Sequence, residues 1–140
     1  MKDRFRIHFP AKLDKLPLML EWIRGHLTQA KIGSDVVGKM ELASEEALTN
    51  IIQHGYQGKK GQIELQFHHL PGSVELVFMD QGPPFNPLES APPPDLKTPL
   101  EKREVGGLGV FLMRKVVDEI RYSRENDTNV LILKHFSRKP

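Results

Sequence analysis

The sequence predicts an α+β fold: a two-layer α/β sandwich in which a mainly antiparallel, mixed sheet is covered on one face by three helices. Two observations predict it. Apolar and polar residues alternate in five short segments, whereas apolar residues recur at helical spacing in three others. Four of the five strand-like segments follow one another in pairs, which favours antiparallel pairing. The length of 140 residues suits one domain, so residues 1–140 are expected to form a single domain.

The N-terminal part of the chain is predicted to form one strand and two helices. Residues 4–9 alternate apolar and polar side chains before a proline, as in an edge strand. Apolar residues at helical spacing then predict a helix over residues 14–29, capped by the aspartate at its first position. A second helix is expected from a cap at Ser34 or Asp35 to about His54.

The C-terminal part is predicted to add two hairpins and a third helix. Alternating residues predict strands over 61–70 and 73–80, joined by a Pro-Gly turn. A short helix is expected over about 109–117. Strands over 119–124 and 129–136, around an Asn-Asp pair, complete the order β-α-α-β-β-loop-α-β-β.

A proline-rich stretch interrupts this pattern between the two hairpins. Residues 81–104 contain seven of the 11 prolines, so no regular element is expected to continue through them. A loop of this length inside one domain is usually functional or disordered.

Composition excludes several classes of protein. The chain has no cysteine, which rules out disulfides, thiolate metal sites and a cysteine nucleophile. Its net charge of +2 comes from intermixed basic and acidic residues and gives little support to nucleic-acid binding. Neither a signal peptide nor a membrane-spanning run is recognisable, so we expect a soluble cytoplasmic protein without direct nucleic-acid or membrane partners.

Two polar motifs fall at the ends of predicted elements. Glu46 and Asn50 lie one turn apart at the border of the apolar arc of the second helix, where they would edge a cleft between helix and sheet. Asp80 ends a strand and is followed by Gly82; a carboxylate there could accept a hydrogen bond from an adenine amino group, and the glycine would leave room for the base. Taken singly, the first motif is more often an ordinary polar helix border, and the second more often an ordinary turn.

A glycine-rich turn is the third motif. Gly106, Gly107, Leu108 and Gly109 open the third predicted helix, where backbone N–H groups and the helix N-terminus could hold phosphate oxygens. The same glycines could equally serve only loop flexibility. The order of the three motifs on helix, strand end and loop-to-helix junction carries more information than any one of them.

In this order the motifs resemble the boxes of the nucleotide-binding domain shared by gyrase, Hsp90, histidine kinases and MutL, the GHKL superfamily. Residues 46–56 resemble the first box, residues 80–85 the second in a proline-bearing form, and residues 106–109 the third. The chain is most similar to the short anti-sigma-factor serine/threonine kinases of this superfamily, over nearly its whole length. The resemblance implies the Bergerat ATP-binding fold, with an ATP lid at about 81–105.

The resemblance also implies a role for each motif. Asn50 would give its amide oxygen to a Mg²⁺ ion that bridges the phosphates of ATP. Asp80 would hold adenine, and Glu46 would orient or deprotonate the hydroxyl group that receives the γ-phosphoryl group. Where the family usually has a Gly-Thr pair at the start of the last strand, this chain has Asp127 and Thr128, so a contact from Thr128 to the nucleotide is a weaker expectation.

The partners follow from the same resemblance. The leading hypothesis is a kinase that phosphorylates an anti-sigma factor antagonist, a STAS-type protein, and sequesters a sigma factor when free. A homodimer with an interface on the first helix is also implied. The alternative is an ATP-dependent binding module without phosphoryl transfer. A histidine-kinase fragment is a third option, although 140 residues leave no room for a phosphoacceptor helix pair.

Overall fold

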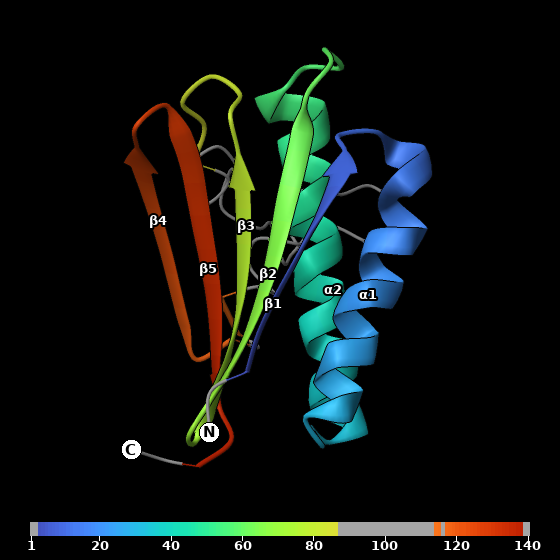
Figure 1. Cartoon of the computed structure of the whole chain (residues 1–140), viewed down its shortest axis with the longest axis vertical. Coiled ribbons are helices and arrows are strands. Elements are labelled where there is room, and N and C mark those ends of the chain that lie inside the picture. The colour runs from blue at the N-terminus through green and yellow to red at the C-terminus, as the bar shows by residue number, and fades with distance from the viewer. Residues whose placement is uncertain (1–2, 87–113, 116, 139–140) are drawn as a thin grey trace, which may run out of the picture.

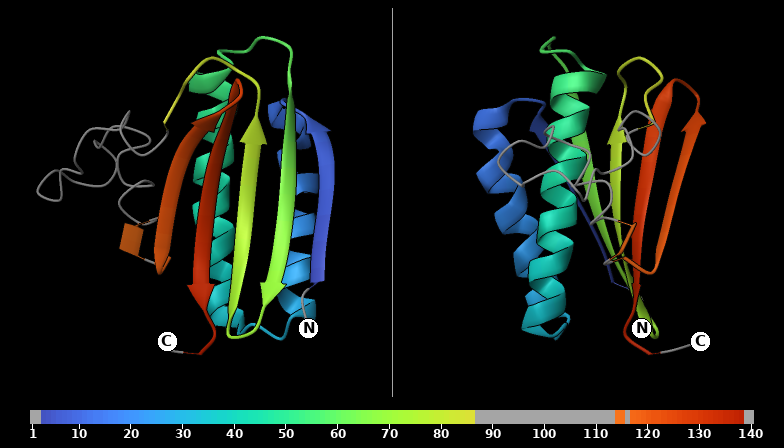
Figure 2. Two further views of the ribbon diagram at one scale, coloured as in Figure 1. Left: turned by 60° about the vertical axis from the view of Figure 1, so that its left-hand side comes forward. Right: turned by 180° about the vertical axis from the view of Figure 1, so that it is seen from behind.

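A computed structural model describes residues 3–86, 114–115 and 117–138. Within them the chain forms two layers, a five-stranded sheet and a pair of long helices that pack on one of its faces (Figures 1 and 2). The predicted two-layer α+β architecture is therefore confirmed. No helix in this described part is both long and apolar enough to cross a membrane.

Every neighbouring pair of strands in the sheet is antiparallel, in the order β1-β2-β3-β5-β4. The strands are β1 (Asp3–Pro10), β2 (Gln62–Leu70), β3 (Ser73–Asp80), β4 (Glu119–Glu125) and β5 (Thr128–Phe136). The prediction of a mixed sheet is thus wrong. Between β1 and β2 the chain passes through two helices that run in opposite directions, so it returns to the end of the sheet at which β1 stopped (Figure 1). Strand β2 therefore runs antiparallel to β1. Strand β1 lies at the edge of the sheet, as predicted.

The helical layer consists of α1 (Leu16–Gln29) and α2 (Ser34–Asn50). A short 3-10 turn, η1 (Leu13–Lys15), precedes α1, and a π-helical turn, η2 (Ile51–Gly55), continues α2. The predicted side-chain caps are not formed: Lys15 and Gly33 occupy the cap positions, with no side-chain hydrogen bond. The aspartate expected to cap α1, Asp14, lies inside η1, one residue before the observed cap position.

The core lies between the two helices and the face of the sheet that they cover. Strands β2 and β3 contribute alternate residues to it, as the period of two predicts. Each fully buried large apolar side chain contributes about 1.5–3 kcal/mol relative to exposure. The largest of these side chains are Met19, Ile23, Leu27, Met40, Leu48, Ile63, Leu65, Phe67, Leu76, Phe78 and Leu131.

Two predicted segments fall wholly or mostly outside the described residues. The third helix, 109–117, is described only at Arg114 and Lys115, which are helical, and at Val117, which is buried. Of the proline-rich stretch, residues 81–86 are described. The turn Gly106–Gly109 and the rest of the predicted lid lie outside the described residues.

Candidate functional site

The first polar motif lies at the C-terminal end of α2. Asn50 is the last residue of that helix and is only 6% exposed, and Glu46 is half-buried one turn earlier. The Asn50 amide nitrogen donates a long hydrogen bond of 3.4 Å to Glu46 Oε1. The bond uses the amide NH₂ group of Asn50, and its carbonyl oxygen is the atom type that a hard cation prefers.

The surroundings of Glu46 raise the pKa of its carboxyl group above that of an ordinary glutamate. Burial raises its pKa, the hydrogen bond from Asn50 lowers it, the nearby Glu45 carboxylate raises it and His54 lowers it, in that order of size. The net effect is a raised pKa. A raised pKa suits a group that accepts a proton during a reaction near neutral pH.

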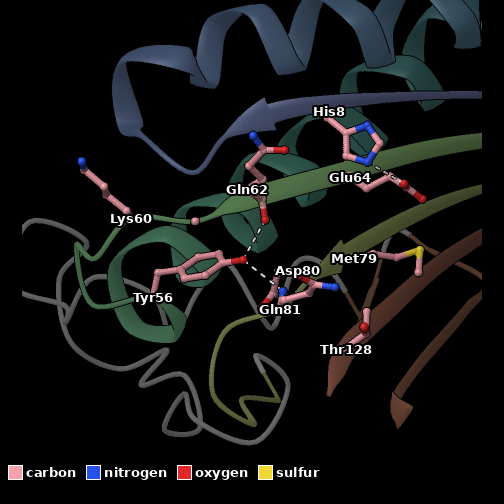
Figure 3. A pocket seen from close by; sticks show the side chains of 10 residues that line it. His8, Tyr56, Lys60, Gln62, Glu64, Met79, Asp80, Gln81 and Thr128 are labelled. Atoms are coloured by element: carbon pink, nitrogen blue, oxygen red, sulfur yellow. Dashed lines mark hydrogen bonds and ion pairs between the residues drawn. The ribbon is translucent and has the colours of Figure 1, made fainter. Parts of the chain in front are cut away.

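Tyr56 fastens the end of the helical layer to the sheet. The backbone N–H of Tyr56 donates to the carbonyl of Ile51 at 2.8 Å, the wide spacing that makes η2 a π turn. Its buried phenol donates to the carbonyl of Gln62 at 2.7 Å and accepts from the N–H of Gln81 at 3.0 Å (Figure 3). The end of α2 and the end of β3 are therefore held at the same end of the molecule.

Two glycines make room for the Tyr56 ring. A Cβ atom on Gly61 would stand 2.2 Å from Tyr56 Cε1, and one on Gly82 would stand 3.2 Å from the same ring and 3.1 Å from Asp80 Oδ1. Gly82 therefore serves the packing of Tyr56 and Asp80. Its predicted contact with a base stays a prediction.

Substituting Gly61 with alanine is expected to destabilise the fold by about 1–3 kcal/mol, because the new methyl group has to displace a buried aromatic ring. Chemical denaturation measures the free energy of unfolding. Gly38→Ala is the matched control: apart from its own helix backbone and chain neighbours, no atom of the described residues lies within 4 Å of the Cβ position of this exposed helical glycine. The change should therefore stabilise by about 0.5–1 kcal/mol. Equal effects of the two substitutions would contradict the packing of Tyr56 against Gly61.

Asp80 is the buried carboxylate of the second motif, with 5% of its surface exposed. Its Oδ1 atom accepts hydrogen bonds from the Gly82 N–H and from the Asn129 amide, both at 3.0 Å. Burial raises the pKa of Asp80, and the bonds from Asn129 and Gly82 and the charge of Arg124 lower it by less, so the net effect is a raised pKa. Asp80 is therefore a carboxylate shielded from water, and its Oδ1 atom already accepts two hydrogen bonds.

Asn129 is the site residue that the sequence analysis missed. It stands directly opposite Asp80 in the β3–β5 register and is 3% exposed. The signal was available, because Asn129 shares the alternation of Leu131 and Leu133, both buried in the core. The Gly-Thr pair of the family indicated the neighbouring Thr128 instead.

Thr128 is half-buried at the start of β5, and its hydroxyl donates a long 3.4 Å bond to the Asn126 carbonyl. It borders a cavity of about 530 Å³ together with Asp80 and Gln81. That cavity extends over residues of the sheet face turned away from the helices, including His8, Glu64 and Met79 (Figure 3). Glu46 and Asn50 do not line this cavity.

The structure places a buried carboxylate at a strand end and an amide and a carboxylate at a helix end, within the two layers expected from the resemblance. The chain belongs to the family of histidine kinase-like ATPase domains, whose profile matches residues 9–135. A serine-protein kinase RsbW of Bacillus thuringiensis (strain Al Hakam) is 26% identical, and one of Bacillus cereus (strain B4264) is 28% identical. Both alignments cover 98% of this chain and 88% of the relative.

A solved structure has the same fold. The crystal structure of the RsbU and RsbW domains of Rv1364c from Mycobacterium tuberculosis superimposes with a TM-score of 0.67 at 18% identity. The match covers 99% of this chain and 33% of that chain, so this chain spans about a third of its length. The predicted membership of the GHKL superfamily is therefore confirmed.

Proposed function

We propose that the protein binds ATP together with Mg²⁺ and transfers the γ-phosphoryl group to a serine or threonine hydroxyl of a protein substrate. The observation that carries the proposal is the joining of Asp80 and the Glu46–Asn50 pair at one end of the fold through Tyr56. Membership of the ATPase family supports the use of ATP. The relatives named serine-protein kinases, at 26–28% identity over most of their length, support the transfer.

The described residues fit the roles that the proposal gives them. The ionised Asp80 carboxylate accepts a hydrogen bond from the adenine amino group, beside Gly82. Thr128 borders the same end of strand β3. Asn50 offers a single amide oxygen to Mg²⁺, which suits an ion that keeps most of its other contacts with phosphates and water. The described residues hold no group of three or more His, Cys, Asp or Glu side chains that could bind a metal ion.

Glu46 is the proposed general base of the transfer step. Its carboxylate accepts the proton of the serine hydroxyl as the oxygen bonds to the γ-phosphorus, and ADP departs with the electrons of the broken bond. Bound Mg²⁺ supplies charge neutralisation at the phosphates. The backbone of Gly106, Gly107, Leu108 and Gly109 is proposed to donate N–H groups to the same phosphates.

The protein substrate proposed here is a STAS-type anti-sigma factor antagonist, and the second partner is a sigma factor that the kinase sequesters in the cytoplasm. A homodimer is part of the same proposal. Its support in the structure is a set of large apolar side chains exposed near α1, with Leu18 50% and Leu13 45% exposed. Exposed apolar residues of this size commonly lie in protein interfaces.

The test is to incubate the protein with γ-labelled ATP, Mg²⁺ and a purified candidate antagonist, and to follow label on the antagonist. Wild type is expected to transfer label, and Asn50→Ala to lose most of the transfer because it removes the amide oxygen. Ser44→Ala is a matched control on the same helix, since its buried hydroxyl only bonds the carbonyl of Met40. Tight ATP binding without transfer to any antagonist would favour the alternative, a nucleotide-dependent binding module.

A further inference from the structure

Asn129 uses its whole side-chain amide in bonds that surround Asp80. Its Nδ2 donates to Asp80 Oδ1 at 3.0 Å and to the Pro83 carbonyl at 2.9 Å. Its Oδ1 accepts from the Phe85 N–H at 3.3 Å and from the Tyr122 hydroxyl. Strand β5 thereby holds both the carboxylate at the end of β3 and the turn that follows it.

The partners of Asn129 also determine which way its amide points. A reversed amide would turn its NH₂ group toward the Phe85 N–H, which can only donate, and its oxygen toward two oxygens that accept. The side chain is 3% exposed, so water does not compensate for such a reversal. The favoured orientation of the amide therefore keeps the Nδ2 group of Asn129 as a donor to Asp80 Oδ1.

This arrangement decides what the carboxylate can recognise. Among the described residues, Asn129 and the Gly82 N–H both donate to Oδ1, which leaves the second oxygen as the group for a ligand. An ionised carboxylate only accepts hydrogen bonds, so it pairs with the 6-amino group of adenine and repels the 6-carbonyl group of guanine. Arg124 steadies the same turn by donating to the Gly82 carbonyl at 2.7 Å.

We infer that Asn129 is a positioning residue for base selection: by bonding Asp80 Oδ1 it keeps the carboxylate ionised and oriented, and so favours adenine over guanine nucleotides. This inference rests on the proposed function. Asn129 itself need not touch the base, since it acts through Asp80.

Calorimetric titration of ADP and GDP into wild type, Asn129→Ala and Asn129→Asp tests the inference, with Ser44→Ala as a control that loses a buried hydrogen bond elsewhere. Asn129→Ala should weaken ADP binding about ten-fold and narrow the ADP preference over GDP, because Asp80 loses a strong donor. Thermal unfolding of each variant checks that it is folded. In the nucleotide-free Asn129→Ala protein, the pKa of Asp80, followed by carboxyl NMR, should rise further.

The pH dependence separates positioning from a merely structural role. Asn129→Asp keeps the shape of the side chain but sets two carboxyl groups against each other, which then share a proton. ADP binding by this variant should strengthen as the pH falls and the pair takes up a proton, whereas binding by wild type weakens as the pH falls toward the raised pKa of Asp80. The other charged or titratable groups facing Asp80 are Arg124 and Tyr56, and burial raises the pKa of the Tyr56 phenol, which therefore stays neutral.

The outcomes distinguish the two proposals. Wild type that binds neither nucleotide would overturn the proposed function, and base selection with it. Wild type that binds ADP, together with a folded Asn129→Ala variant of unchanged affinity and unchanged preference, would overturn only the role of Asn129.

Discussion

Asp80→Asn is expected to weaken ATP binding by about two orders of magnitude, a loss of about 2–3 kcal/mol. The substitution preserves shape but removes the charge that makes the carboxylate a strong acceptor. With its oxygen kept against Asn129 Nδ2 and the Gly82 N–H, the new amide presents its NH₂ group to the adenine amino group, a donor against a donor. Calorimetric titration with ATP measures the loss.

The same substitution should leave the nucleotide-free fold as stable as wild type or more stable. The folded-state pKa of Asp80 is raised, so between its ordinary and raised values the native state binds more protons than the unfolded state. Stability therefore falls as pH increases through that window, and the charged side chain costs stability at neutral pH. Thermal unfolding should show a melting temperature that does not drop, as expected where a binding group is kept at the expense of stability.

ATP binding by wild type should also weaken as the pH falls toward the raised pKa of Asp80, because a protonated carboxyl group is a poorer acceptor. Asp80→Asn should abolish this pH dependence. The matched control is Asp35→Asn, the same change at an exposed side chain in the first turn of α2, at the other end of that helix from Asn50. Retention of wild-type ATP affinity by Asp80→Asn would contradict the assignment of the adenine site.

Glu46→Gln is expected to lower the rate of phosphoryl transfer about 10³-fold while changing ATP affinity little. Glutamine keeps the size of the side chain and its contact with Asn50 but cannot take a proton from the substrate hydroxyl. In wild type, kcat should increase with pH through the raised pKa of Glu46, since only the ionised form accepts the proton. Single-turnover transfer of labelled phosphate measures the rate.

Glu45→Gln supplies the matched control for this second prediction. Glu45 is the preceding residue of α2, exposed to solvent, and about 100° around the helix from Glu46. The same loss of charge there should leave the transfer rate within about two-fold of wild type, because a solvent-exposed charge is well screened. Equal losses at both positions would indicate a general electrostatic effect and remove the case for a base at Glu46.

Much of the fold was predictable because its signals are local. The period of two in residues 61–80 and the Pro-Gly turn within them predict the β2–β3 hairpin, whose observed bounds are Gln62–Leu70 and Ser73–Asp80. The Asn-Asp pair predicts the second hairpin, and Asn126 and Asp127 indeed adopt positive φ angles of 50° and 62°. The prediction of a mixed sheet was wrong because the direction of a strand depends on the end of the sheet to which the preceding helix pair brings the chain.

The candidate site was less predictable because its contacts are long-range. The sequence placed Asp80 at the end of its strand, which the structure confirms. It extended the second helix to about His54, whereas α2 ends at Asn50 and continues as the π turn η2. One of the two bonds that Asp80 Oδ1 accepts comes from Asn129 of β5, 49 residues later, and Tyr56 reaches Gln81 across 25 residues. No periodicity reports such a pairing, although the inward register of Asn129 could have indicated it.

The hydrogen bond between Asn129 and Asp80 also has a consequence for biosynthesis. A ribosome completes the helix end with Asn50 and the strand end with Asp80 well before it completes β5, which inserts between β3 and β4. Until that insertion the Asp80 carboxylate lacks the Asn129 donor, so a nascent chain that already contains both polar motifs does not yet hold Asp80 as the complete sheet does. The final orientation of Asp80 is therefore expected only when the C-terminal hairpin docks on β3.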